Sequence, residues 1–120
     1  MILYAVMAET SVVQLFVAGI NYRKSDLQTR GRFALTGNAQ QELLAEARRS
    51  GYREIFALST CNRTELYALG HDPEQAIAML CAHAKGTVEE FATQGYVKQG
   101  MEAAEHLMHV SQDRKSTRLN

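Results

Sequence analysis

Two short apolar segments separated by a brief polar stretch constrain the fold of this chain more than any other feature. Residues 55–58 and 65–69 are each about as long as a typical buried strand and too short for an ordinary helix. Residues 59–64 between them are rich in serine, threonine and asparagine, which are typical of turns and caps. We therefore expect two consecutive strands with a turn and no helix between them.

Further elements are expected upstream of this pair. The mostly apolar run 12–20 predicts a first strand, and residues 27–33 predict a short helix. Asn38, followed by Gln41 at capping-box spacing, predicts the start of a longer helix that ends before Gly51.

The sequence downstream of the pair predicts helices and one edge strand. Asp72 as N-cap and Pro73 at the first helical position give the clearest helix start in the chain. Residues 87–90 have the spacing of a second capping box, 96–97 predict a short edge strand, and 101–110 predict a last helix.

The predicted elements follow the order βαββαβ and end with a helix, which is an α+β fold class resembling the ferredoxin-like split βαβ arrangement. A chain of 120 residues has room for one such domain with a single core. We place the domain at residues 12–112, after an N-terminal extension at 1–11. Residues 113–120 are polar and basic without helical or strand period, so we expect a disordered tail that is foreign to the fold.

Charge and cysteine content restrict the function classes. Lys plus Arg number 13 and Asp plus Glu number 13, so the formal net charge is 0. A domain that binds nucleic acid by itself usually carries a basic excess, so any contact with RNA is expected to be local or shared with other parts of the protein. The apolar start at residues 1–7 is too short for a signal peptide or a membrane span. Nothing indicates an oxidising compartment for the 2 cysteines, so we expect a cytoplasmic protein with free thiols and no membrane contact.

Cys61 is the strongest candidate for a catalytic residue. It follows a predicted strand, where its thiol can reach solvent and substrate. A thiolate is a far better nucleophile than a thiol, and Arg63 can either favour the thiolate or bind a substrate carboxylate as a planar fork. Thr60 and Asn62 add neutral groups that can orient a substrate. The alternative is that Cys61 is a small buried hydrophobe at the end of a strand.

Other titratable residues are weaker candidates. On a helical wheel His106 points away from an apolar stripe and is therefore not an obvious core residue; its alternative is an ordinary exposed histidine. That stripe comprises Met101, Ala104, Leu107 and Met108. Cys81 shares an apolar helix face with Leu80 and is expected in the core. No cysteine or histidine pair has a spacing that suggests a metal site.

The run 59–67 resembles the signature of glutamyl-tRNA reductase, the enzyme that starts tetrapyrrole (porphyrin) synthesis from glutamate. Residues 19–22 and 30–34 resemble the opening segment of that family, and 106–110 resemble its histidine helix. The resemblance covers about residues 15–110.

This resemblance implies an oxidoreductase mechanism and roles for single residues. Cys61 would attack the ester between glutamate and tRNA to give a thioester, which NADPH would reduce to glutamate-1-semialdehyde. Thr60, Asn62 and Arg63 would line the glutamate pocket, with Arg63 as the partner of substrate carboxylate. His106 would be the second catalytic residue and would assist proton transfer.

The resemblance also defines what this chain is expected to lack. No Gly-x-Gly-x-x-Gly run follows a strand, so we expect the NADPH site in a domain downstream of this chain and no full reductase activity here. The implied partner is glutamyl-tRNA, which the locally basic stretch 21–33 would contact unless that stretch is only a solvated face. The full-length family enzyme would be a homodimer, and we expect this chain to be monomeric. Two alternatives stay open: a non-catalytic ferredoxin-like binding module, and another cysteine-dependent acyl transferase or hydrolase.

Overall fold

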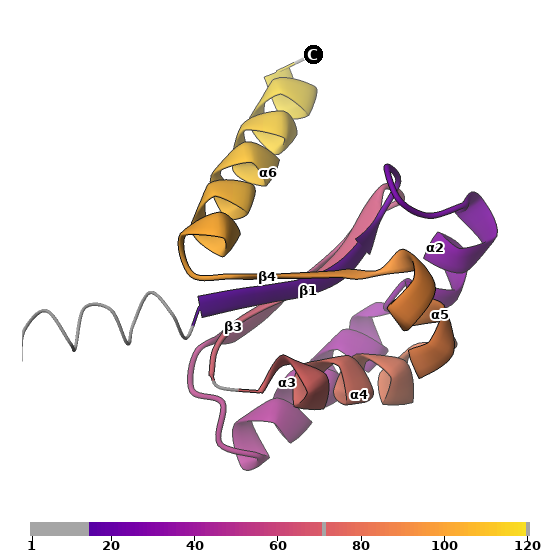
Figure 1. Ribbon diagram of the computed structural model, residues 1–120, viewed down its shortest axis with the longest axis vertical. Coiled ribbons are helices and arrows are strands. Elements are labelled where there is room, and N and C mark those ends of the chain that lie inside the picture. The colour runs from indigo at the N-terminus through magenta and orange to yellow at the C-terminus, as the bar shows by residue number, and fades with distance from the viewer. Residues whose placement is uncertain (1–14, 71, 120) are drawn as a thin grey trace, which may run out of the picture.

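A four-stranded sheet organises the chain, and helices pack on both of its faces (Figure 1). The computed structural model describes residues 15–70 and 72–119, so the expected extension at 1–11 lies outside the described residues. The strands are β1 (Leu15–Asn21), β2 (Ile55–Ser59), β3 (Arg63–Leu69) and β4 (Tyr96–Gln99). The helices are α2 (Leu27–Phe33), α3 (Gly37–Arg49), α4 (Pro73–His83), α5 (Val88–Gln94) and α6 (Met101–Leu119).

The sheet has the strand order β2-β3-β1-β4, and all three neighbouring pairs are antiparallel. The chain is therefore an α+β fold, as the sequence predicts. Because β1 and β2 are each antiparallel to β3, they run parallel to one another on either side of it. The predicted strand pair 55–58 and 65–69 is confirmed as the hairpin of β2 and β3.

The two faces of the sheet have different partners. Alternation along β1 sends Phe16, Ala18 and Ile20 into the main core, beneath α3, α4 and α5. Val17 faces the other way and packs with Tyr67 and α6. In Figure 1, α3, α4 and α5 lie on one side of the sheet and α6 on the other. Along β3 the same alternation gives residues 63, 65 and 67 to the α6 side.

Helix starts follow local capping signals. Asp72 accepts hydrogen bonds from the N–H groups of Glu74 and Gln75, with Pro73 at the start of α4, which confirms that prediction. The capping box of residues 87–90 is also confirmed. The predicted cap at Asn38 was wrong, because the hydroxyl of Thr36 lies two residues earlier and accepts the N–H of Ala39 at 3.1 Å.

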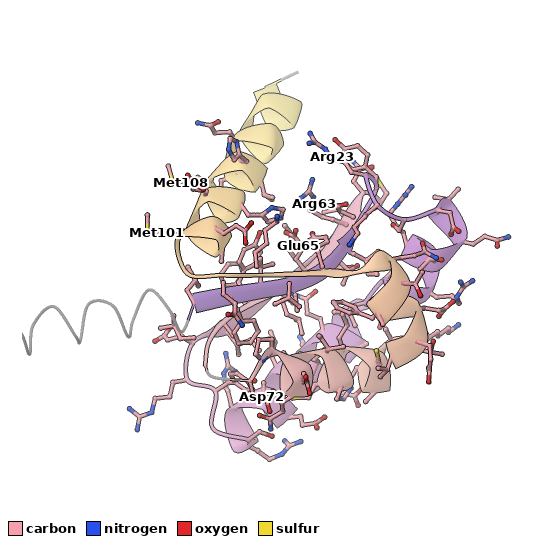
Figure 2. All side chains as sticks on the ribbon, viewed as in Figure 1. Arg23, Arg63, Glu65, Asp72, Met101 and Met108 are labelled. Atoms are coloured by element: carbon pink, nitrogen blue, oxygen red, sulfur yellow. The ribbon has the colours of Figure 1, made fainter. Side chains whose placement is uncertain are left out.

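Helix α6 differs from the sequence prediction in its packed face and its length. Ala103 packs against Val17 and Tyr67 of the sheet and Val110 is also buried, whereas Met101 and Met108 are each 65% exposed. Figure 2 shows both methionines on the side of α6 that points away from the sheet. The predicted stripe was therefore wrong for Met101 and Met108, whereas Leu107 packs against the cluster of Val17, Tyr67 and Ala103. The backbone continues as helix to Leu119 where a disordered tail was expected, and no glycine or proline interrupts residues 101–119.

Candidate active site

Four side chains converge on the carboxylate of Glu65, whose side chain is 0% exposed. Tyr67 Oη donates to Oε1 at 2.8 Å, and Tyr96 Oη donates to Oε2. His106 Nε2 lies 2.5 Å from Oε2, and Arg63 Nη1 lies 3.4 Å from the same oxygen. The carboxylate thus joins β3, β4 and α6 on one face of the sheet.

The strand register creates this convergence. Gly19 of β1 lies opposite both Glu65 of β3 and Tyr96 of β4. A Cβ atom at residue 19 would lie 2.7 Å from Glu65 Cγ, so only glycine leaves room for this carboxylate. Because Gly19 has no side chain, the hydroxyl of Tyr96 on β4 can reach across β1 to Glu65 on β3.

The environment keeps both tyrosines as hydrogen-bond donors. Burial, and then the neighbouring charge of Glu65, raise the pKa of Tyr67 and of Tyr96 far above the ordinary value. Their hydroxyl groups therefore stay protonated under all physiological conditions. A buried carboxylate is tolerated only when it is hydrogen-bonded and paired, and here the tyrosines and Arg63 provide those partners.

A cavity of about 450 Å³ lies next to this cluster and has a basic lining. It is lined by Asn21, Arg23, Arg63, Lys98, His106, His109 and Val110. The side chains of Arg63 and His106 are only 11% and 15% exposed, so both are held within the wall. Figure 2 shows Arg63 and Glu65 in the space between the strands and α6, with Arg23 nearby. A cavity of this character suits an anionic ligand.

Cys61 lies at the tip of the β2–β3 turn and is exposed, which contradicts the alternative of a buried strand-end residue. Its Sγ is 3.9 Å from Asn62 Oδ1. The turn itself is fixed, because the N–H of Thr60 donates to the carbonyl of Arg63 at 2.8 Å and the N–H of Tyr22 donates to that of Asn62 at 2.9 Å. The structure thus brings Arg63 and His106 to one cavity, whereas Cys61 is not among its described lining residues and stands two positions from Arg63.

The basic stretch 21–33 makes contacts within the fold. Lys24 Nζ donates to the carbonyl of Gly95 at 2.9 Å, and Arg32 forms an ion pair with Glu90. Arg30 Nε lies 3.4 Å from the carbonyl of Cys61 and so braces the turn that carries the thiol. The stretch is therefore more than a solvated basic face, and only Asn21 and Arg23 of it line the cavity.

The comparison with known families decides the assignment. The family model described as "Glutamyl-tRNAGlu reductase, N-terminal domain" matches residues 18–117.

The chain belongs to this family.

Relatives and a solved structure support the assignment of the chain to the glutamyl-tRNA reductase N-terminal domain family. The chain is 40% identical over 95 residues to a glutamyl-tRNA reductase of Flavobacterium psychrophilum, covering 79% of this chain and 23% of that protein. It is 42% identical over 95 residues to one of Christiangramia forsetii, with the same two shares of 79% and 23%. The solved glutamyl-tRNA reductase from Methanopyrus kandleri shares the fold, with a TM-score of 0.59 at 22% identity, over 79% of this chain and 21% of that one. The chain spans less than a quarter of the length of these relatives.

Within this family member, sequence reasoning missed Glu65 and its two tyrosines. The alternative of an ordinary exposed histidine was wrong for His106, because its side chain is only 15% exposed and contacts Glu65 of the sheet. The available signal for Glu65 was the alternation of β3, which places Glu65 and Tyr67 on one face of the strand and the apolar Leu66 and Ala68 on the other. Cys81, in contrast, packs against the main core as expected, and burial raises the pKa of its thiol.

The described residues do not fit a dinucleotide cofactor. Such sites lie where parallel strands end at a glycine-rich turn that opens a helix, and neighbouring strands here are all antiparallel. The N–H groups that open α4 are already bonded to Asp72. In the same part of the chain, no group of three or more histidine, cysteine or acidic side chains could hold a metal ion, and no helix has the length and apolar character to cross a membrane.

Proposed function

We propose that this chain is the catalytic domain of a glutamyl-tRNA reductase and that its own residues carry out the first half-reaction, the transfer of the glutamyl group from tRNA to Cys61. The observation that carries the proposal is an exposed thiol on a braced turn, two residues from an arginine that lines a basic cavity with His106. Membership of the family supports glutamyl-tRNA as the substrate.

In the proposed step, the Sγ of Cys61 attacks the carbonyl carbon of the glutamyl ester. The bond between that carbon and the ribose oxygen breaks, and the oxygen leaves with the electron pair. His106 takes the thiol proton of Cys61 and gives it to this oxygen, which restores the ribose hydroxyl. The products are a glutamyl thioester on Cys61 and free tRNA.

Arg63 is the proposed partner for the side-chain carboxylate of glutamate, which is the only free carboxylate once the other is esterified. Its guanidinium is held at Nη1 by Glu65 and can offer its other N–H groups to the ligand. Thr60 and Asn62 complete the proposed pocket beside Cys61. Arg23 and Lys98, on the same cavity lining, suit the phosphates of the tRNA acceptor end.

Reduction of the thioester to glutamate-1-semialdehyde requires NADPH, which we propose binds outside the described residues. The thioester is then the last species that these residues reach by themselves. The homodimer and the cytoplasmic location implied by the family belong to this proposal as well. We also propose that the fold is the ferredoxin-like split βαβ arrangement, which the strand order β2-β3-β1-β4 and its antiparallel pairs support.

Acyl transfer in the absence of NADPH tests the proposed function. The chain is incubated with tRNA carrying labelled glutamate, and the tRNA is then digested with ribonuclease. Label bound to protein is measured after acid precipitation and again after hydroxylamine, which cleaves thioesters. We expect hydroxylamine-sensitive label on the wild-type chain and on Cys81→Ser, and none on Cys61→Ser. Equal labelling of Cys61→Ser would contradict the assignment of Cys61 as the nucleophile. Release of free glutamate from the charged tRNA with no label on the protein would favour a hydrolase.

A further inference from the structure

We infer that Glu65 is a positioning residue that fixes the tautomer of His106, so that Nε2 carries the ring hydrogen and Nδ1 is the nitrogen that exchanges protons with a substrate in the cavity. The catalytic consequence rests on the proposed function, whereas the tautomer itself does not. Glu65 lies within the run 59–67 that carries the family resemblance, but the resemblance assigns it no role.

The argument begins with the roles of the groups around the carboxylate. Arg63 can only donate hydrogen bonds, and the raised pKa values of Tyr67 and Tyr96 keep their hydroxyl groups protonated as donors. The oxygens of Glu65 are therefore acceptors in this cluster. His106 Nε2 lies 2.5 Å from Oε2, and an acceptor at that distance requires a hydrogen on Nε2.

A hydrogen on Nε2 determines the chemistry left to the ring. A neutral imidazole carries one N–H, so Nδ1 is then an acceptor and can take a proton from a substrate or a thiol. Once protonated, the ring can return that proton through Nδ1 while Nε2 stays bonded to Glu65. The aromatic ring of Tyr96, 5.4 Å away and inclined at 57°, packs against the imidazole and limits its rotation.

The same carboxylate also orients the proposed substrate anchor. Glu65 Oε2 contacts both His106 Nε2 and Arg63 Nη1. One buried group thereby sets the relative positions of the proton-transfer residue on α6 and the carboxylate-binding residue on β3. In serine proteases, loss of the carboxylate that holds the catalytic histidine in one tautomer lowers kcat by about 10⁴-fold.

Nitrogen NMR tests the tautomer directly. The two ring nitrogens of His106 are identified in the uniformly ¹⁵N-labelled chain by comparison with His106→Gln, and their shifts are recorded at pH 8. We expect the pattern of a single Nε2–H tautomer in the wild type. The pattern of an Nδ1–H tautomer, or of two tautomers in rapid exchange, would overturn the inference.

Two variants test whether Glu65 is the cause. Glu65→Met keeps the approximate volume and removes both acceptors, and we expect it to lose the single-tautomer pattern. Tyr67→Phe removes a donor from the other oxygen, and we expect it to keep the pattern. A folded Glu65→Met chain that keeps the wild-type pattern would overturn the role of Glu65, and if that variant does not fold, the wild-type pattern still decides the tautomer.

The acyl-transfer assay separates this inference from the proposed function. We expect Glu65→Met to lower the rate of thioester formation by at least about tenfold. If the wild-type chain shows the Nε2–H tautomer but transfers no glutamyl group, the proposed function fails and the positioning of His106 stands. If transfer is normal in Glu65→Met, the positioning role fails and the proposed function stands.

Discussion

Gly19 lies directly opposite Glu65 in the sheet, and the space left by its missing side chain holds the methylene groups of that glutamate. A Cβ atom at residue 19 would lie 2.7 Å from Glu65 Cγ and 2.7 Å from the carbonyl oxygen of Thr64. The second contact is with backbone, so rotation of a side chain cannot relieve both. The position of the buried carboxylate therefore depends on a glycine in the neighbouring strand.

Gly19→Ala should destabilise the fold and disturb the Glu65 cluster. Overpacking of this kind typically costs about 1–3 kcal/mol, which urea unfolding followed by circular dichroism will measure. Gly31→Ala is the matched control, because a Cβ atom at Gly31 meets nothing within 4 Å and alanine favours the helix. Equal stability of Gly19→Ala and the wild type would contradict the close approach.

The two cysteines should differ in their rates of alkylation. Cys61 is exposed, whereas Cys81 is partly buried and its thiol pKa is raised by burial. We expect iodoacetamide at pH 8 to modify Cys61 at least about tenfold faster, as measured by mass spectrometry of peptides. Modification in denaturant, where both thiols react freely, is the control. Similar rates in the folded chain would be inconsistent with the exposed position of Cys61.

Local signals in the sequence predicted much of the fold but less of the site. Asp72 with Pro73, and the capping box at 87–90, act within a few residues, so they can be recognised without tertiary structure. The burial of Glu65 could not be predicted in this way, because glutamate is almost never fully buried unless it is paired. Its partner His106 is 41 positions away in the sequence.

The packed face of α6 could not be predicted from local sequence signals either. A helical wheel favoured the side with Met101 and Met108, which are the larger apolar residues, yet both are exposed. The packed side is decided by Ala103, which is small enough to lie against Val17 and Tyr67, and by the bond from His106 to Glu65. Both contacts depend on side chains of the sheet, which the sequence of the helix alone does not reveal.

Alkaline pH should destabilise the fold through the buried Tyr67 and the partly buried Tyr96. Their pKa values are higher in the folded chain than in the unfolded one, so their contribution to stability is fully present below the unfolded value of about 10 and is lost as the pH rises above it. We expect tyrosinate absorbance at 295 nm from Tyr67 and Tyr96 to appear together with loss of the circular dichroism signal. The difference from Tyr67→Phe and Tyr96→Phe isolates their share. Ionisation of either residue while the signal is still native would contradict the cluster.

Arg63→Lys should weaken binding of the glutamyl group. A lysine keeps the charge but cannot reproduce the planar contact with a carboxylate. The guanidinium group of Arg63 can contact Glu65 along one edge and the ligand along another, which an ammonium group cannot do. We expect an increase of about tenfold in the concentration of glutamyl-tRNA that gives half-maximal thioester formation. Arg53→Lys is the matched control, because Arg53 is exposed and does not line the cavity. Equal changes in the two variants would contradict a specific role for Arg63.

Lys98→Gln should reduce the affinity for tRNA in a way that depends on salt. Lys98 lies on the cavity lining. Its ion pair with Glu102, at 3.9 Å, joins β4 to the start of α6 and contributes little, because Glu102 is exposed to solvent. Its charge is therefore available for a phosphate of the acceptor end. Each phosphate contact releases condensed counterions, so losing one should reduce the slope of log affinity against log salt by about 1 or slightly less. Binding is measured with glutamyl-tRNA between low and moderate salt.

Lys85→Gln is the control, because this substitution removes the same charge from the chain. Lys85 is exposed on the connection between α4 and α5, outside the cavity. If both variants lower the slope equally, net charge explains the effect and the cavity does not bind the phosphates.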